Sequence, residues 1–341
     1  MAELRWTHRP DGSNWGEFGA DDRLGRLNLL TPEKVLQGIA EVRAGLSFCL
    51  SLPLDLPGGN VANPRRRPPR LFAAEQDGVP VFNQIRGRGV VSDDAVLLYS
   101  QYSTQWDSFA HAGALFDADG DGVAEIVYYN GWRGGETVVA PTETPGAPSG
   151  QRFEGSHAHE LGIDGFAVKG IQGRGVLVDL HSRFGRERVP VTCDQLMAIM
   201  AEDRVTVEPG DILLLYTGYD EVILEGGGVP THDAIHHSCA GLEGGDEALR
   251  DWIARSGVAA IASDNRAVEL IPARNAARTG TAAPIHELCL FKLGIPLGEQ
   301  WLLRDLARWL REHDRSRFLL TAPPLRLPGA VGSPVTPIAT V

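Results

Sequence analysis

The stretch Gly210-Asp211-Ile212-Leu213-Leu214-Leu215-Tyr216 decides the fold class of this sequence. Its apolar run, Ile212–Tyr216, is short and follows Gly-Asp, which is the pattern of a β-strand with a turn before it. Similar short apolar runs, most of them bounded by Gly, Asp or Pro, lie at Ala95–Tyr99, Ile126–Tyr129, Val176–Leu180, Val258–Ala262 and Phe318–Leu320. The sequence therefore predicts a sheet whose strands are spread over most of the chain.

Helical segments are interspersed with these strands. Thr31-Pro32-Glu33 begins one, because Thr caps a helix well and Pro is tolerated at its first position, and Gly45 ends it. Thr192-Cys193-Asp194-Gln195 fits a capping box. Further helices are predicted at Asp246–Ser256, Pro284–Leu293 and Trp301–Leu310. Because strict β-α-β alternation is weak in the first half, we predict an α/β fold with a curved, mixed β-sheet or barrel-like core and flanking helices.

The length of 341 residues allows one large domain or two ordinary ones, at roughly 100–200 residues each. No repeat, linker or domain boundary is visible, so we predict a single domain over residues 1–341. Residues 1–50 are expected to form an N-terminal arm and helix, and residues 56–94 a loop-rich insertion. Its run Pro64-Arg65-Arg66-Arg67-Pro68-Pro69-Arg70 is open to two interpretations, an anion site or a solvated loop.

The composition excludes several classes of protein. The net charge is −12 with no basic stripe, which argues against nucleic acid and anionic membrane surfaces as partners. No apolar run approaches a membrane span of ~20 residues, and no signal peptide is visible. The four cysteines, without a CxxC pair, do not suggest a disulfide framework or a cysteine-bound zinc, so a reduced, cytoplasmic location is expected. They are Cys49, Cys193, Cys239 and Cys289.

Residues 100–111 contain the candidate catalytic and ligand side chains of the first half of the chain. Two carboxamides, an indole, a carboxylate and an imidazole follow a predicted strand within eleven positions: Gln101, Gln105, Trp106, Asp107 and His111. Asp107 would not share a helical face with Gln101, but an irregular loop could bring all of these side chains to one point. The alternative is a polar turn that satisfies its own backbone.

Two more clusters carry ligand-type side chains. His286 lies on a mostly apolar predicted helix and Glu299 beyond its end, a pair suited to a divalent metal, although a lone His there is also typical of a core. His232 and His236 have i, i+4 spacing, and His237 follows. Without a glutamate between them they fit a metal pair, a pocket or a lid.

Together these clusters resemble the cyclase family of metal-dependent hydrolases, which includes bacterial kynurenine formamidases and isatin hydrolases. The family signature HxGTHxDxxxH has its frame in Gln101-x-Ser103-Thr104-Gln105-x-Asp107-x-x-x-His111, and its downstream His and Glu in His286 and Glu299 around Gly294-Ile295. Similar segments extend from Asn14-Trp15-Gly16 to Gly332-Ser333-Pro334. The resemblance therefore covers nearly the whole chain and implies the swivelling β/β/α fold of the family.

The resemblance also implies a metal site. In the family the signature His pair and Asp bind one metal, and the same Asp binds a second with the downstream His and Glu. Here both signature histidines are Gln, whose carboxamide oxygen is a harder and weaker ligand than imidazole. We therefore expect one divalent metal, Mn or Zn, at Asp107, His286 and Glu299, with Gln101 and Gln105 as weaker ligands, or no metal.

Three functions remain open. The first is a metal-dependent hydrolase of an amide, formamide, cyclic imide or lactone in a small cyclic or aromatic substrate, with metal-activated water and His111 as acid/base. The second is a metal-free lyase or cyclase, in which Asp107 orients His111 and Gln101 and Gln105 donate hydrogen bonds to a substrate oxygen. The third is a non-catalytic small-molecule binding protein.

Substrate contacts are expected from Gln101, Ser103, Gln105 and Trp106. The indole of Trp106 either stacks on a flat substrate or packs in the core. Family members are commonly dimers or tetramers, so the resemblance implies a homodimer or homotetramer.

Overall fold

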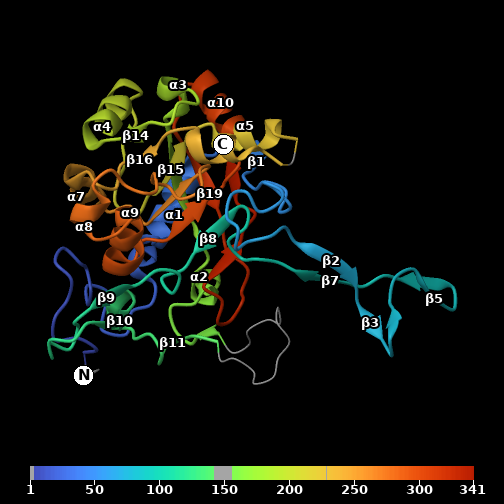
Figure 1. Ribbon diagram of the computed structural model, residues 1–341. Coiled ribbons are helices and arrows are strands. Elements are labelled where there is room, and N and C mark those ends of the chain that lie inside the picture. Colours follow the sequence, from blue (N-terminus) through green and yellow to red (C-terminus); the bar gives the residue numbers. More distant parts are fainter. Residues whose placement is uncertain (1–3, 142–155, 228) are drawn as a thin grey trace.

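The computed structural model describes residues 4–141, 156–227 and 229–341, and its centre is a curled mixed sheet (Figure 1). In the described residues the sheet has nine strands in the order β1-β21-β19-β13-β15-β17-β18-β8-β20. Their bounds are β1 (Ser47–Cys49), β8 (Gln105–Asp107), β13 (Gln172–Asp179), β15 (Ile212–Tyr216), β17 (Ala260–Ser263), β18 (Leu297–Glu299), β19 (Arg317–Thr321), β20 (Gly332–Pro334) and β21 (Ile338–Thr340).

The middle of the sheet is parallel and its two sides are antiparallel. β13, β15, β17 and β18 run in one direction, whereas β19 pairs antiparallel with β13, and β8 with β18. All five residues of β15 are buried, because elements cover both faces of a parallel sheet. The strand predicted at 212–216 matches β15 residue for residue, and the predicted α/β fold around a curved mixed sheet is confirmed.

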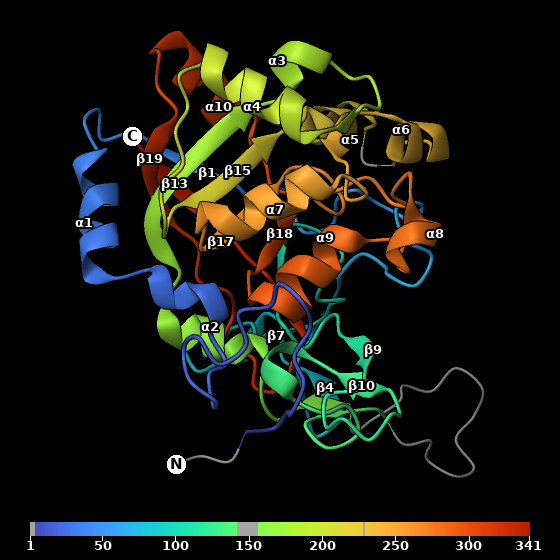
Figure 2. The ribbon, with the colours of Figure 1, turned by 90° about the vertical axis from the view of Figure 1, so that its left-hand side faces the viewer.

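Helices flank the sheet (Figure 2), and α1 packs against β13 and β19. The predicted capping box at Thr192 is present at the start of α4, whereas α1 ends at Ala40, before the expected stop at Gly45. The α-helices are α1 (Pro32–Ala40), α2 (Ile163–Lys169), α3 (His181–Phe184), α4 (Cys193–Glu202), α5 (Tyr219–Glu225), α6 (His232–His237), α7 (Glu247–Ser256), α8 (Ala276–Thr279), α9 (Pro284–His286) and α10 (Arg304–Glu312). The described residues also form the 3₁₀ turns η1 (Gly25–Leu29) and η2 (Tyr129–Gly131).

The segment 284–293 is not the continuous α-helix that its apolar pattern predicts. One turn, α9, is followed by the π-helical segment η3 (Glu287–Leu293). Gly294 ends it with φ +58, and a Cβ there would lie 2.7 Å from Cα of Gly25. Only glycine fits this close approach, which turns the chain into β18.

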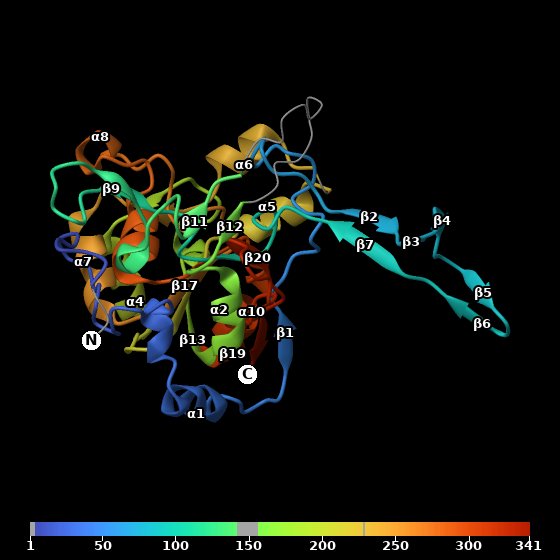
Figure 3. The same ribbon diagram turned by 90° about the horizontal axis from the view of Figure 1, so that it is seen from below.

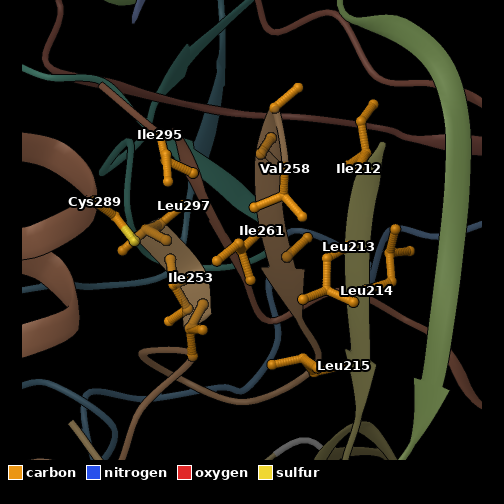
Figure 4. Close-up of a cluster of buried hydrophobic side chains, with 14 of the residues drawn as sticks. Ile212, Leu213, Leu214, Leu215, Ile253, Val258, Ile261, Cys289, Ile295 and Leu297 are labelled. Carbon is orange, nitrogen blue, oxygen red and sulfur yellow. The ribbon is translucent and has the colours of Figure 1, made fainter. Parts of the chain in front are cut away.

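The hydrophobic core packs on the central sheet, and one part of it surrounds β15 and β17. Ile212 to Leu215 of β15 pack with Ile261, Leu297 and Cys289 in one cluster (Figure 4). These side chains are buried, and close packing of this kind fixes the strands relative to one another. This cluster includes Leu297 of β18, which pairs directly with β8.

Twelve further strands of the described residues lie outside the central sheet, and six of them fall between residues 70 and 97 (Figure 3). We call Arg70–Leu97 the hairpin arm. It extends away from the body of the molecule and exposes large apolar side chains, Phe72 and Ile85 among them. These outer strands are β2 (Arg70–Ala73), β3 (Glu75–Gln76), β4 (Val79–Pro80), β5 (Gln84–Arg86), β6 (Gly89–Val91), β7 (Asp94–Leu97), β9 (Ala114–Phe116), β10 (Glu125–Val127), β11 (Val138–Val139), β12 (His157–Ala158), β14 (Pro190–Val191) and β16 (Gly241–Leu242).

The insertion expected at 56–94 thus contains paired strands as well as loops. Among the described residues, no helix has the length and apolar character that crossing a membrane requires.

Candidate metal centre

The site is built on the pairing of β8 with β18. Gln105 lies opposite Glu299 in this antiparallel pair, and Asp107 is two residues further along β8. Because side chains alternate along a strand, Gln105 and Asp107 point to the same face of the sheet and Trp106 to the other. The expectation of an irregular loop is therefore wrong for residues 105–107, where regular strand geometry brings the two polar side chains together.

His286 joins these residues from α9. Its Nε2 lies 3.2 Å from Oε1 of Glu299, and ligand atoms of Asp107, His286 and Glu299 all lie within 4.8 Å of one another. Asp107 has no exposed surface, and the side chain of Glu299 is nearly as buried. The structure thus brings together the three residues that the sequence proposed as ligands, although they are up to 192 positions apart.

Glu269 also belongs to this centre, and the sequence analysis missed it. Its Oε1 lies 2.9 Å from Nδ1 of His286 and accepts the backbone N–H of His286 at 2.8 Å, while Oε2 accepts that of Ile285 at 3.1 Å. Metal-bound histidines commonly have such a carboxylate on the second ring nitrogen, where it fixes the orientation of the ring. The available signal was a carboxylate inside the apolar run Ala267–Pro272.

Gln105 lies between the two carboxylates. Its Nε2 donates to Oδ1 of Asp107 at 3.2 Å and to Oε2 of Glu299 at 3.0 Å. Oε1 of Gln105 and Oδ2 of Asp107 are both buried and accept no hydrogen bond from the described residues. Two buried oxygen atoms without donors, beside an imidazole and a second carboxylate, fit a divalent cation.

Burial and neighbouring charges shift the pKa values of Asp107 and His286. Burial raises the pKa of Asp107 to about 6, with His111 opposing the shift and Glu299 adding to it. Burial disfavours the charged form of His286, but hydrogen bonds and attraction from Glu269 and Glu299 outweigh it and raise the pKa of His286 to about 10. In the absence of a bound cation, protonated His286 therefore balances part of the negative charge of these carboxylates.

Gln101 and His111 lie at the mouth of the site. Nε2 of Gln101 is 3.4 Å from Nδ1 of His111, and Nε2 of His111 is 3.8 Å from Oδ2 of Asp107. Gln101 packs so closely on β20 that a Cβ at Gly332 would lie 2.4 Å from its Nε2. Gln101, His111, His286 and Glu299 line one cavity of about 290 Å³, which is open to solvent.

Other residues singled out in the sequence lie elsewhere. Trp106 is fully buried, donates from Nε1 to the carbonyl of Ala322 at 2.9 Å and is not among the residues lining the cavity. Ser103 is buried as well, and its Oγ lies 3.4 Å from the carbonyl of Pro53. His232 stacks on His236, whose Nε2 contacts the carbonyl of Val61 at 3.0 Å. Among described residues these histidines belong to no metal-binding group.

A curled mixed sheet with an imidazole and two carboxylates converging at β8 and β18 defines an α/β protein with a candidate metal centre. Residues 48–270, more than half of the chain, match the Cyclase family. The chain belongs to this family, which confirms the resemblance inferred from the sequence. No curated protein matches the sequence.

Solved structures agree with this assignment. The chain is similar to a structure described as a novel cyclase, with 29% identity, a TM-score of 0.75 and coverage of 96% of this chain and 97% of the other. Isatin hydrolase A from Labrenzia aggregata has 13% identity, a TM-score of 0.56 and coverage of 91% and 98%. For isatin hydrolase A from Ralstonia solanacearum the values are 15%, 0.55, 91% and 97%. At 13% and 15% identity, the similarity to these two hydrolases shows a shared fold.

Proposed function

We propose that the protein is a metal-dependent hydrolase that cleaves a carbonyl–heteroatom bond in a small cyclic or aromatic substrate. One observation carries this proposal: ligand atoms of Asp107, His286 and Glu299 converge within 4.8 Å at the edge of a cavity. The isatin hydrolases with the same fold, whose name indicates a cyclic aromatic substrate, support the type of reaction.

The donor set decides which metals suit the site. Asp107, His286 and Glu299 would hold the ion, and a rotated Gln105 amide would offer its unpaired Oε1. One imidazole with several oxygen donors suits Mn²⁺ as well as Zn²⁺. A bound divalent ion supplies polarisation of a carbonyl and a lowered pKa of water.

The chain's own residues provide positioning and proton transfer. Nδ1 of His111 faces the Gln101 amide, and Nε2 lies on the side of Asp107. His111 takes a proton from water at Nε2, and the imidazolium formed in this way gives that proton to the leaving nitrogen or oxygen. Asp107 and Gln101 hold the ring between them, and Glu269 fixes the orientation of His286.

A metal-free lyase or cyclase is the second candidate, and the position of Gln105 favours it. Its Nε2 already donates to both Asp107 and Glu299, so the two carboxylates share a hydrogen-bond donor without a bound ion. On this alternative Asp107 orients His111, and Gln101 donates to a substrate oxygen. Glu299 then has a structural role, because its side-chain contacts are with Gln105 and His286 and not with the substrate.

Metal analysis with matched variants distinguishes these candidates. Protein purified without chelator is analysed for metals and assayed with isatin, cyclic imides and N-formyl aromatic amines, before and after EDTA. We expect about one bound ion and activity that EDTA removes and Mn²⁺ or Zn²⁺ restores, both lost in Glu299→Gln. Glu243→Gln changes a buried carboxylate outside the site and serves as control.

The contrary outcomes point to the alternatives. Substoichiometric metal with activity that survives EDTA, and that depends on His111, would identify the metal-free enzyme. Binding of these compounds without turnover under any of these conditions would identify a non-catalytic binding protein.

We also infer that the chain forms a homodimer or homotetramer. Two-stranded hairpins need a packed face for stability, yet the hairpin arm exposes Leu71, Phe72, Ile85 and Val90. A second copy of the chain that covers the arm would bury them. Light scattering of the native protein and of an Ile85→Glu, Val90→Glu variant tests this, with a monomeric native protein as the contrary result.

A further inference from the structure

Three arginines line the same cavity as the candidate metal ligands. Arg65 and Arg66 come from the loop that precedes the hairpin arm, and Arg266 follows β17. The cavity is thus lined by the carboxylate of Glu299 and the imidazole of His286 together with three guanidinium groups. Arg65 is exposed and Arg66 is half-buried, whereas the other two arginines of the run, Arg67 and Arg70, do not line the cavity.

These arginines have no carboxylate partner. Within the ranges 4–141, 156–227 and 229–341, no Asp or Glu oxygen lies within 4.0 Å of their side-chain nitrogens. Arg174, by contrast, has a carboxylate partner, since its Nε lies 2.9 Å from Oδ1 of Asp211. A cavity with three cationic groups, none of which has a carboxylate within 4.0 Å among the described residues, attracts an anionic ligand.

Two of the three guanidinium groups are fixed in position. Nη1 of Arg66 donates to the carbonyl of Gln101 at 2.7 Å, and Nη1 of Arg266 donates to that of Ala62 at 2.8 Å. A guanidinium has five N–H donors in a rigid fork, so one bond to the backbone leaves others for a ligand. Since Gln101 also contacts His111, Arg66 connects this part of the wall to the proposed proton-transfer residue.

We propose that the substrate carries an oxyanion, a carboxylate or a phosphate, on the part of the molecule away from the bond that is cleaved. The position of that bond rests on the proposed function. The oxyanion takes charge-assisted hydrogen bonds from Arg65 and Arg266, which give both affinity and orientation. An uncharged ring would leave the three guanidinium groups without a partner in the bound state, so the cavity selects against it.

Calorimetric titration with benzoate, phenyl phosphate and the uncharged benzamide tests this directly. The protein is used as purified and again after EDTA treatment. We expect at least one of the two anions to bind roughly tenfold or more tightly than benzamide in both preparations. The tighter of the two anions identifies the class of oxyanion. Arg65→Gln and Arg266→Gln should each weaken that anion by roughly tenfold and leave benzamide unchanged.

Arg308→Gln, an equal change of charge on α10 away from the cavity, should have no effect. Should Arg266→Gln fail to fold, Arg65→Gln still decides the matter, because the only side chain that Arg65 bonds among the described residues is Asn63 of the same loop. Equal binding of the anions and benzamide overturns the proposal. So does anion binding that disappears with EDTA and is insensitive to the arginines. Neither the anion preference nor the effect of the arginine variants requires turnover. Both measurements therefore still test this proposal if the protein proves not to be a hydrolase.

Discussion

Nδ1 of His286 lies 2.9 Å from Oε1 of Glu269, a carboxylate with no exposed side-chain surface. The same carboxylate accepts the first backbone N–H groups around α9, so one side chain fixes both the imidazole ring and the turn that carries it. Nε2 of His286 is thereby directed at Glu299 and the candidate metal position.

Glu269→Gln is therefore expected to weaken metal binding while the fold is kept. The amide preserves the shape and one acceptor oxygen but removes the negative charge that holds the ring, and loss of such a partner typically costs 10–100-fold in metal affinity. Competition with a fluorescent chelator measures the effect. Glu243→Gln is the matched control, since that buried carboxylate also accepts backbone N–H groups, of Gly245 and Arg274. Equal losses in both variants would contradict the assigned role.

Gln105→His should change which metal the site prefers. Gln105 occupies a position where the family signature has histidine, and it lies between Asp107 and Glu299. Imidazole nitrogen is a better zinc ligand than a carboxamide oxygen, so the ratio of Zn²⁺ to Mn²⁺ affinity should rise by on the order of tenfold. Titration of both ions into native and variant protein measures this ratio. Gln172→His on β13, at a half-buried position that does not line the cavity, controls for a new imidazole. An unchanged ratio would place Gln105 outside the metal site.

The sequence predicted the fold well where local signals agree with the tertiary structure. β15 and the capping box of α4 were predicted because apolar runs and caps act over a few residues. The start of α1 was predicted for the same reason, but its end was not, since Gly45 is only one of several places where the helix could stop. The π-helical segment after α9 escaped prediction because its apolar pattern is also that of an α-helix.

The candidate site was only partly predictable. Asp107, His286 and Glu299 stand out as ligand types in a familiar order, but their convergence depends on the register of β8 against β18. Glu269 was missed because its role lies in a contact across 17 residues, with no local motif to indicate it. Arg65 and Arg66 are a similar case. The run at residues 64–70 is more typical of a solvated loop, and only the fold shows that these two arginines line the cavity.

The stability of the protein should fall as pH rises through the range in which Asp264 ionises. Burial raises the pKa of Asp264 to about 8, and repulsion by Asp220 adds to the shift, while donors from Thr217 and Tyr219 oppose it. A folded-state pKa above the unfolded value means that stability is greatest below the unfolded pKa, is lost as pH rises toward the folded pKa and is constant above it. The free energy of unfolding should therefore decrease between about pH 6 and about pH 8, which both lie within this range.

Asp264→Asn should reduce this slope, because the amide does not ionise and keeps an acceptor for the Thr217 backbone. Urea unfolding at the two pH values measures it, with Asp305→Asn on the surface as control. An identical slope in native and Asp264→Asn protein would show that Asp264 does not titrate in this range.

Trp106→Phe separates the two roles that the sequence allowed for this indole. Trp106 packs edge-on against Trp301, with ring centroids 5.0 Å apart, and its Nε1 donates to the carbonyl of Ala322. Phenylalanine removes the donor and part of the volume, so the free energy of unfolding should fall by about 1–3 kcal/mol. The value of kcat/KM should stay within about twofold, because a side chain buried on the opposite face from Asp107 does not reach the substrate. Trp252→Phe on α7, half-buried against the same core, controls for the loss of an indole. A raised KM with unchanged stability would instead mean that Trp106 stacks on the substrate and that the cavity opens through the sheet.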